Sequence, residues 1–524
     1  MKNSEELRQQ LRSINRKSYP AYKGLKGLYH FGNYILSIDH VQGDPFASPS
    51  HVSIQISHRD AGFPVEYYKD TLTGTTLCDY LTRQFEKQVS QYSFRAKGSG
   101  KSGLLTVSHC GQEILSRTAC EITEKGITAR FFVGFPANGR TINATELEKI
   151  LFDFLPVCIQ KSFFYSSLNA KELQNYIKLA EDQEFIRQTL PAKNLCAFIA
   201  DGSILPRESG ISSRPMKASV PFTSPDSLRI SINLPHKGKI TGMGIPKGIT
   251  LIVGGGYHGK STLLNALELG VYNHIPGDGR EYVITDATAV KLRSEDGRFI
   301  KDVDISMFIN DLPNKKDTRC FSTLDASGST SQAAGIAESI EAGSHLFLLD
   351  EDTSATNFMV RDAFMQQVIQ REKEPITPFL ERAEDLYKKA GISTILVAGS
   401  SGAFFHIADT IIQMDNYVPK DITASVKKLC SQYPLPAVSV TDFQLPHSHR
   451  IMSRPAESSK RLIHNSRGNH SDSGAAKPER LKTRISGTDG FSLGRQEIDL
   501  RYTEQLIDTE QTAALGLLLK YAVE

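Results

Sequence analysis

The spacing of apolar residues in the first part of the chain predicts a domain of mixed strands and helices. Short apolar or alternating runs, which are typical of strands, lie between glycine turns at residues 104–108, 113–123 and 127–137. Helical spacing follows at residues 144–164 and 170–190, and the charged N-terminus has the spacing of an amphipathic helix. We therefore expect an α/β domain over residues 1–190.

The rest of the chain is predicted to hold a larger domain and a small C-terminal helical region. Strand and helix patterns alternate over residues 191–445, which favours a largely parallel sheet covered by helices. Residues 446–486 carry nine Lys or Arg, three acidic residues and four histidines with little apolar spacing, as in a flexible basic linker. Apolar spacing returns at residues 487–524, where we expect a pair of helices.

A phosphate-binding loop is predicted where the apolar run 249–253 ends. The pattern Gly254-x-x-x-x-Gly259-Lys260-Ser261 follows this run and opens a helical pattern. In such a loop, backbone N–H groups and the helix N-terminus surround a triphosphate, the lysine reaches the β- and γ-phosphates, and the serine ligates Mg²⁺. The predicted nucleotide-binding residues are Gly254, Gly255, Gly256, Tyr257, His258, Gly259, Lys260, Ser261 and Thr262.

Two of these residues have an open role. Tyr257 and His258 occupy the variable positions of the loop. Their side chains either contact nucleotide or the opposite subunit, or point outward, and the outward arrangement is favoured.

A second nucleotide motif ends the apolar run 346–349. Asp350 and Glu351 follow this run directly, so a buried strand would deliver both carboxylates to the edge of the sheet beside the phosphate loop. Asp350 suits the Mg²⁺ ion, and Glu351 suits the activation of the attacking water. We therefore predict Ser261 and Asp350 as metal-binding residues and Glu351 as the catalytic residue.

A serine- and glycine-rich turn between these motifs predicts a second anion site. It opens a helical pattern that closes at Gly343, and its residues are Ser327, Gly328, Ser329, Thr330, Ser331 and Gln332. This turn resembles the signature sequence of ABC-class ATPases, usually LSGGQ. The resemblance implies that two nucleotide domains pack head to tail, with the signature of one subunit closing the site of its partner.

Further stretches resemble the same class, with one departure. Residues 350–357 are similar to its Walker B and D-loop run, which makes Ala355, Thr356 and Asn357 the D-loop residues. The class normally places a switch histidine after its last core strand, where this chain has Gly399, Ser400 and Ser401. His406 comes too late and is expected on a helix face. Asn310 is a candidate for the glutamine of the Q-loop.

The resemblance narrows to one family within that class. Strings such as HVQGDPFASPS (40–50), ADGSILPRESG (200–210), GVYNHIPGDGRE (270–281) and DEDTSATNFM (350–359) resemble the predicted stand-alone ABC-class ATPases of bacteria and of a kinetoplastid mitochondrial RNA-processing protein. The resemblance covers nearly the whole chain. It implies an α/β P-loop NTPase with an N-terminal α/β domain, a homodimer, and, through the kinetoplastid member, RNA binding.

A second GKS string does not predict a second phosphate loop. In residues 95–103, RAKGSGKSG, an arginine replaces the first glycine and no buried strand precedes it. Arg95, Lys97 and Lys101 are instead candidates for contacts with a nucleic-acid backbone, since cations and backbone amides suit phosphates. A solvated hairpin loop explains the string equally well.

Composition narrows the class of protein without naming a ligand. The net charge of +3 over 524 residues neither demands nor excludes a polyanion. Seven scattered cysteines without a C-x-x-C pair indicate neither a disulfide framework nor a zinc site. No apolar stretch reaches the length of about 18 residues that a membrane span requires, so we expect a cytoplasmic protein without a membrane domain.

These patterns together predict an ATP hydrolase that uses ATP and Mg²⁺. With the resemblance, we expect a homodimer with composite sites, acting on a ligand for which RNA and DNA are candidates. The alternative is a nucleotide-gated clamp on nucleic acid in which hydrolysis is slow or incidental, and the absent switch histidine favours it.

Overall fold

The computed structural model describes residues 1–361, 368, 373–433, 442–447, 450 and 481–523, and it divides into two compact units. The first unit comprises Met1–Phe185, Leu234–Gly238 and Tyr272–Glu281. The second comprises Ile186–Asn233, Lys239–Val271 and Tyr282–Glu524. Most of the basic segment predicted at 446–486 lies outside the described residues.

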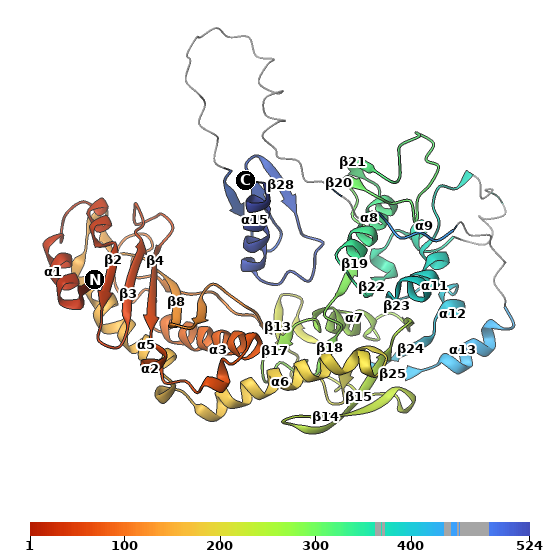
Figure 1. Cartoon of the computed structure of the whole chain (residues 1–524), viewed down its shortest axis with the longest axis horizontal. Helices are drawn as coiled ribbons and strands as arrows, with labels where there is room; N and C mark the ends of the chain where they lie inside the picture. The colour runs from red at the N-terminus through yellow and green to blue at the C-terminus, as the bar shows by residue number, and fades with distance from the viewer. Residues whose placement is uncertain (362–367, 369–372, 434–441, 448–449, 451–480, 524) are drawn as a thin grey trace, which may run out of the picture. The chain divides into compact units, whose positions relative to one another are not determined.

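The first unit is built on an antiparallel sheet with strand order β2-β3-β4-β8-β5, extended by β1 beside β2 and by β7 beside β8 (Figure 1). Its strands are β1 (Lys2–Asn3), β2 (Gly27–His30), β3 (Ile35–His40), β4 (Ser50–Ile56), β5 (Leu105–Thr106), β6 (Glu113–Ile114), β7 (Cys120–Thr123), β8 (Gly126–Val133), β9 (Ala137–Asn138), β10 (Thr141–Ile142) and β17 (Asn273–His274). Its helices are α1 (Ser4–Ser13), η1 (Tyr19–Leu25), α2 (His58–Ala61), η2 (Val65–Tyr67), α3 (Thr71–Ser90), α4 (Ala144–Glu148), η3 (Lys149–Phe154), α5 (Leu155–Phe163), η4 (Tyr165–Ser167) and most of α6 (Ala170–Ala192).

Several of these elements were predicted. The amphipathic N-terminal helix is confirmed as α1, which buries Leu7 and Leu11. The helical pattern at 144–164 forms α4 and α5, joined by a wider π-helical turn. Pro156, at the start of α5, lacks the N–H that a regular helix would use there, which accounts for the widened turn before it.

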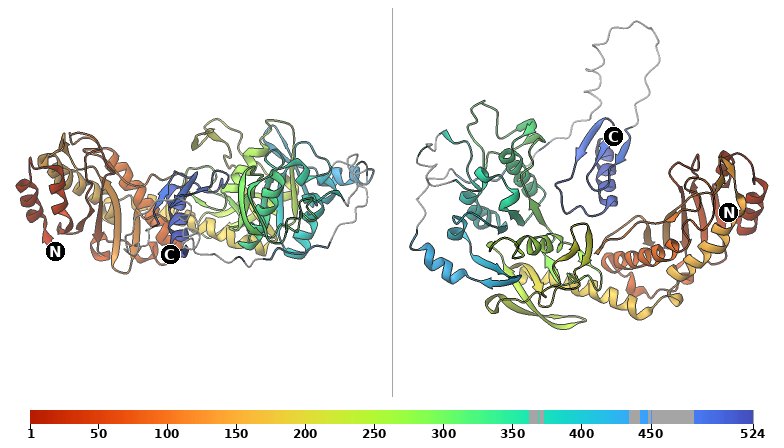
Figure 2. Two further views of the ribbon diagram at one scale, coloured as in Figure 1. Left: turned by 90° about the horizontal axis from the view of Figure 1, so that it is seen from above. Right: turned by 180° about the vertical axis from the view of Figure 1, so that it is seen from behind.

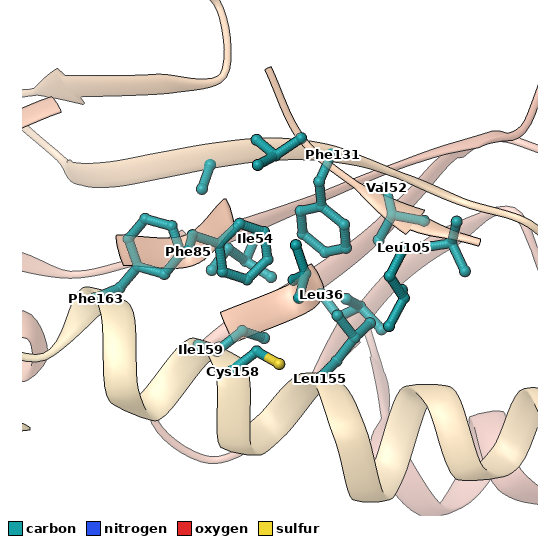
Figure 3. Packing of buried hydrophobic residues seen from close by; sticks show 14 of the residues in the cluster. Leu36, Val52, Ile54, Phe85, Leu105, Phe131, Leu155, Cys158, Ile159 and Phe163 are labelled. Atoms are coloured by element: carbon teal, nitrogen blue, oxygen red, sulfur yellow. The ribbon is translucent and has the colours of Figure 1, made fainter. Parts of the chain in front are cut away.

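The core of the first unit lies between one face of the sheet and helices α3 and α5. Figure 3 shows Leu36, Val52, Ile54 and Phe131 of the strands facing Phe85 of α3 and Leu155, Cys158, Ile159 and Phe163 of α5. The rings of Phe85 and Phe131 meet at 5.1 Å between centroids. Because side chains alternate across a strand, the residues between these ones lie on the opposite face of the sheet.

A buried carboxylate joins α3 to α6 and to the loop before β7. The side chain of Asp79 is fully buried and pairs with Arg83 at 2.6 Å and with Arg117 at 2.5 Å. The hydroxyl of Tyr176 donates to the same carboxylate at 2.9 Å. Removing one member of such a group leaves the others buried without their partner, so Asp79 is important for the stability of this unit.

The second unit contains a six-stranded sheet with the order β19-β22-β23-β16-β24-β25. Its first five strands are parallel and β25 is antiparallel, which confirms the predicted, largely parallel sheet. A second sheet, with the order β14-β15-β11-β18, was not foreseen and is antiparallel where β11 meets its neighbours.

The strands of the second unit are β11 (Leu195–Ala200), β12 (Arg207–Ser209), β13 (Ser212–Pro215), β14 (Arg229–Leu234), β15 (Gly238–Pro246), β16 (Ile249–Val253), β18 (Val283–Thr285), β19 (Ala289–Leu292), β20 (Arg298–Val303), β21 (Phe321–Ala326), β22 (Leu346–Asp350), β23 (Ser393–Val397), β24 (Thr410–Asp415), β25 (Val418–Asp421), β26 (Thr483–Ile485), β27 (Gly490–Leu493) and β28 (Gln496–Asp499). Its helices include η5 (Asp226–Leu228), α7 (Lys260–Leu269), α8 (Gly328–Glu341), η6 (Glu351–Thr353), α9 (Thr356–Met359), α11 (Phe379–Ala390), α12 (Phe404–Ile407), α13 (Thr423–Cys430) and α15 (Thr509–Val523).

The C-terminal region differs from its prediction. The second expected helix is present as α15, but the first is wrong, because residues 483–499 form the three-stranded sheet β26-β27-β28, which lies beside α15 in both views of Figure 2. Phe491 and Leu493 alternate toward the buried side, and Gly494 at φ 63° makes the turn that follows. A Cβ on Gly516 of α15 would lie 3.2 Å from the Phe491 ring, so strand and helix pack closely.

Among the residues that the model describes, no helix combines the length and the apolar character needed to cross a membrane.

Candidate functional site

The predicted nucleotide motifs follow three strands that are neighbours in the parallel sheet. Strand β16 leads into the glycine loop, β22 into Asp350 and Glu351, and β23, which pairs with both, into Gly399 and Ser400. The carboxyl ends of parallel strands form one edge of a sheet, which is where open α/β sheets bind ligands. The order of the strands therefore brings all three segments into one site.

The loop after β16 has a backbone that requires glycine at both ends. Gly254 has φ 142° and Gly259 has φ 96°, which are conformations that other residues rarely adopt. A Cβ on Gly254 would lie only 2.4 Å from the carbonyl oxygen of Met414. Helix α7 begins directly afterwards at Lys260, so its first backbone N–H groups are available to an anion.

Lys260 holds the loop in a closed shape. Its Nζ donates to the carbonyl oxygens of Gly254 and Gly255, at 2.8 and 2.9 Å. The next residue, Ser261, is exposed and Thr262 is half-buried. The cation and the hydroxyl that nucleotide chemistry needs thus lie together at the start of α7.

Tyr257 and His258 behave differently from each other. Tyr257 is 99% exposed and has φ 63°, so its side chain points outward as expected. His258 instead accepts a hydrogen bond from the backbone N–H of Asn416 at 2.9 Å, in the turn between β24 and β25. This contact anchors the tip of the loop to the edge of the sheet.

Asp350 and Glu351 have opposite electrostatic environments. Burial raises the pKa of Asp350, whose carboxylate accepts a hydrogen bond from the N–H of Asp352. Burial also acts to raise the pKa of Glu351, but hydrogen bonds from Ser400, Gly399 and Ser401 outweigh it and hold that pKa below its ordinary value. Glu351 is therefore kept as a carboxylate.

The segment after β23 binds the Glu351 carboxylate closely. The backbone N–H groups of Gly399 and Ser400 donate to Oε2 at 2.7 and 3.0 Å, and the Ser400 hydroxyl donates to Oε1 at 2.6 Å. This segment stands where the switch histidine was expected, and His406 lies farther along on α12. The sequence shows the missing histidine, whereas this contact joins segments that are far apart in the chain.

The serine-rich turn begins helix α8, and its side chains point in two directions. Ser327 is exposed and its hydroxyl lies 2.9 Å from that of Thr330. Ser331 and Gln332 are buried, and the Gln332 amide donates to the Ser354 hydroxyl and accepts from the N–H of Ala355. The outward-facing side chains of the turn are thus those of Ser327 and Thr330, whereas Gln332 holds the D-loop of its own chain.

The remaining D-loop residues lie on the start of α9. Asn357 is exposed and accepts a hydrogen bond from the Ser329 hydroxyl at 2.7 Å, and Thr356 is exposed beside it. Asn310, the candidate Q-loop residue, donates its side-chain amide to the carbonyl of Ser306 at 2.7 Å. That bond lies within its own turn.

The oxygen ligands present fit a magnesium ion. Ser261 offers an accessible hydroxyl at the start of α7, and Asp350 offers a carboxylate at the end of β22, close enough for the charge of Lys260 to act on it. Mg²⁺ prefers oxygen ligands and is usually held by one or two protein groups together with phosphates. Ser261 and Asp350 would hold such an ion, which would neutralise phosphate charge.

The other predicted contact residues lie in the first unit. Arg95 and Lys97 are exposed and Lys101 is half-buried, in a loop that turns into β5 instead of opening a helix. A Cβ on Gly100 would lie 2.6 Å from the carbonyl of Pro45, and one on Gly103 would lie 2.2 Å from that of Ala96. The glycines therefore allow close packing within this loop and against the loop between β3 and β4.

Comparison with known protein families gives three matches. The model of a P-loop domain named ABC_ATPase matches residues 169–448. The model of the N-terminal region of ATPases of the ABC class matches residues 4–166, and that of the MRB1590 C-terminal domain matches residues 482–524.

The chain is also similar to individual proteins. It is 31% identical over 266 residues to the uncharacterized protein MJ1628 of Methanocaldococcus jannaschii, a match that covers 48% of this chain and 58% of that relative. Among solved structures, MJ1267, an ATP-binding cassette of an ABC transporter in its ADP conformation, is 13% identical with a TM-score of 0.25, covering 37% of this chain and 88% of that one. CbiO1 from Clostridium perfringens, part of an ABC transporter complex, is 14% identical with a TM-score of 0.23, covering 37% and 86%.

Proposed function

Because the chain belongs to the family of ABC-class ATPases, we propose that it binds ATP and Mg²⁺ between two copies of itself and hydrolyses the ATP. The observation that carries the proposal is the row of strand ends β16, β23 and β22, which brings Lys260, Ser400 and Glu351 to one edge of the sheet. Lys260 and the N–H groups of α7 bind the phosphates, Ser261 and Asp350 hold the metal ion, and Glu351 orients the attacking water.

The partner subunit completes the site in this proposal. A helix N-terminus attracts anions, and α8 presents one at an exposed serine, Ser327. The phosphate loop of the same chain already has its own helix N-terminus at Lys260. We therefore assign Ser327 and Thr330 to contacts with the nucleotide bound by a second copy. The closing of the two copies on ATP would then drive a change in a bound ligand, RNA or DNA.

Complementation between two inactive variants tests the composite site. Lys260→Ala removes the phosphate contact, and Ser327→Arg blocks the outward face of the turn without breaking a side-chain cap, since Ser327 makes none to the backbone. Each variant alone is expected to be inactive. Mixed together, they should recover about a quarter of the wild-type ATP turnover, because about half of the dimers are mixed and each keeps one intact site.

The control for this experiment is a mixture of each variant with itself at the same total concentration. A mixture that hydrolyses ATP no faster than the two variants measured separately would contradict a site shared between copies. Sedimentation of the wild-type chain with and without ATP and Mg²⁺ gives a second measurement, in which a larger ATP-dependent species is expected.

A second candidate function is a nucleotide-gated clamp with slow hydrolysis, and the contacts of Glu351 favour it. Both oxygens of this carboxylate are bound by Gly399 and Ser400, so it must leave them before it can orient a water molecule. A nucleotide-dependent affinity for nucleic acid, measured across a salt series, distinguishes a gated clamp from simple attraction to basic residues, which gives a salt slope alone.

Replacing Ser400 with Ala is expected to raise ATP turnover. The change removes the hydroxyl that donates to Glu351 Oε1 but leaves the backbone donors. Freeing the carboxylate from one of its several hydrogen bonds should increase the rate by about threefold to tenfold. This change in the barrier is smaller than the full value of about 1.5–3 kcal/mol for a hydrogen bond to a charged group, because the backbone donors remain. The measurement is kcat at saturating ATP and Mg²⁺.

Ser401→Ala is the matched control, because the Ser401 hydroxyl accepts from the N–H of Ala403 and makes no hydrogen bond to Glu351. Its turnover should match the wild type. A fall in turnover for Ser400→Ala would show that Ser400 positions Glu351 for the reaction and does not restrain it.

A further inference from the structure

The open face of the sheet in the first unit carries a row of three rings. His40, His51 and Phe132 belong to the adjacent strands β3, β4 and β8, where His51 is the register partner of both others. The ring centroids of His40 and His51 are 5.4 Å apart, and those of His51 and Phe132 are 5.1 Å apart. The neighbouring residues Val52 and Phe131 point into the core (Figure 3), so the row faces away from it.

These rings are accessible. His40 and His51 are exposed, and Phe132 is 38% exposed although phenylalanine is usually buried. The strands β2, β3 and β4 face the viewer in Figure 1 with no helix drawn over them. The pKa of His51 lies below its ordinary value, because partial burial and then the neighbouring His40 disfavour its charge.

The basic loop 95–103 lies at the end of the sheet that bears the row. The N–H of Lys101 donates to the carbonyl of Pro45, in the loop between β3 and β4, at 2.8 Å. Gly134 follows Phe132 by two residues, and its carbonyl accepts from the N–H of Gly103 at 2.9 Å. A Cβ on Gly134 would lie 1.8 Å from the carbonyl oxygen of Lys101, so only glycine allows this approach.

Basic residues at this end of the sheet favour a polyanion. Arg95 and Lys97 are exposed on the basic loop. Arg140 is also exposed and pairs with Asp44 at 2.9 Å. Asp39, whose carboxylate accepts from the hydroxyls of Ser37 and Ser53, acts electrostatically on His51, so the phosphates are expected on the basic loop and not beside Asp39.

The rest of the face is largely polar. Apart from the rings, β4 and β8 present exposed Gln55 and Arg130, whereas Ser37 and Ser53 on the same face are buried. Rings on a surface beside cations are the features that bind single-stranded nucleic acid, because bases stack on the rings while phosphates contact the cations. Bases in a duplex are already stacked on each other and cannot use such a surface.

We propose that His40, His51 and Phe132 stack against the bases of a single-stranded nucleic acid whose phosphates contact Arg95, Lys97 and Lys101. The proposal rests on the proposed function in that it names the ligand class and places its site in the N-terminal unit. Because the contacts are to base faces and phosphates, recognition should be tolerant of sequence.

The test is the affinity of the full chain for a fluorescent single-stranded oligonucleotide, measured by anisotropy without ATP. The paired substitution His51→Ala and Phe132→Ala is expected to weaken binding by about thirtyfold or more, from about 1–3 kcal/mol for each of two stacked bases. The single substitution Phe132→Tyr keeps a ring and should retain most of the wild-type affinity. Leu28→Ala is the matched control, because Leu28 is an exposed apolar residue on β2 of the same sheet and lies outside the row.

A salt series separates the two kinds of contact. Lys97→Glu should reduce the dependence of the affinity on salt, whereas the ring substitutions should leave that dependence unchanged. Equal affinity for a duplex of the same sequence, or wild-type affinity in the paired ring variant, would overturn the proposal. Absence of any binding at low salt would overturn it in favour of a protein partner. Measuring RNA and DNA oligonucleotides in parallel identifies which of the two is preferred.

This measurement is independent of the ATPase proposal. Oligonucleotide binding is measured without ATP, and ATP turnover in the complementation experiment is measured without nucleic acid. Loss of one result leaves the other standing, so the failure of either proposal can be recognised.

Discussion

Replacing Glu351 with Gln is expected to lower ATP turnover by about two to four orders of magnitude, the usual effect of losing a general base. The amide keeps the size of the side chain but cannot accept a proton from water. ATP binding should persist, since Lys260 and the backbone of α7 are unchanged. The expected product is a dimer that retains ATP, measured by light scattering during chromatography and by the nucleotide recovered from the peak.

Asp352→Asn is the matched control for this substitution. Asp352 is the next residue, it is exposed, and its backbone N–H, which contacts Asp350, stays in place. Its turnover should remain within about twofold of the wild type, because the exposed Asp352 side chain has no role in the proposed mechanism and its backbone contact is kept. Unchanged turnover in Glu351→Gln would remove Glu351 from the catalytic role, and loss of turnover in both variants would point to net charge at this edge of the sheet.

The largest expected loss of stability comes from Asp79→Ala. The substitution removes the carboxylate that pairs with Arg117, whose side chain is 3% exposed, and that also binds Arg83 and the Tyr176 hydroxyl. Arg83 keeps its bonds to the carbonyls of Gly111 and Glu113. Breaking a buried ion pair on one side costs about 3–5 kcal/mol. The measurement is urea unfolding of the full chain followed by tyrosine fluorescence, where the transition of the first unit should move to lower urea.

Tyr176→Phe provides the comparison within the same group. It removes one hydrogen bond to Asp79 and keeps both ion pairs, so its cost should be near the value of about 1.5–3 kcal/mol for a hydrogen bond to a charged group. An Asp79→Ala variant as stable as Tyr176→Phe would mean that Arg83 and Arg117 find other partners.

The sequence predicted the nucleotide elements well because their patterns are local. An apolar run, two glycines and a lysine placed the end of β16 and the start of α7, and the run before Asp350 placed the end of β22. Helix α8 was likewise indicated by its own residues. Each of these features depends on neighbours within a few positions, which a single sequence displays.

Contacts between distant segments could not be predicted in the same way. The bonds from Ser400 to Glu351 depend on β23 lying between β22 and β16, and no spacing in the sequence reveals that order. Gln332 likewise turns inward, where its side-chain oxygen accepts a hydrogen bond from the N–H of Ala355 in the D-loop. The C-terminal strands were missed because each is only three or four residues long, and so short an alternation of apolar residues cannot be told from helical spacing.

The closed shape of the glycine loop has a thermodynamic consequence for nucleotide entry. Lys260 Nζ already bonds to the carbonyls of Gly254 and Gly255, so it exchanges these partners for an arriving phosphate. No disordered segment has to fold when the phosphate binds. Little backbone entropy is then lost on binding, since ordering a residue costs about 1–2 kcal/mol. Titration calorimetry should accordingly give a small heat-capacity change, far below that of coupled folding and binding.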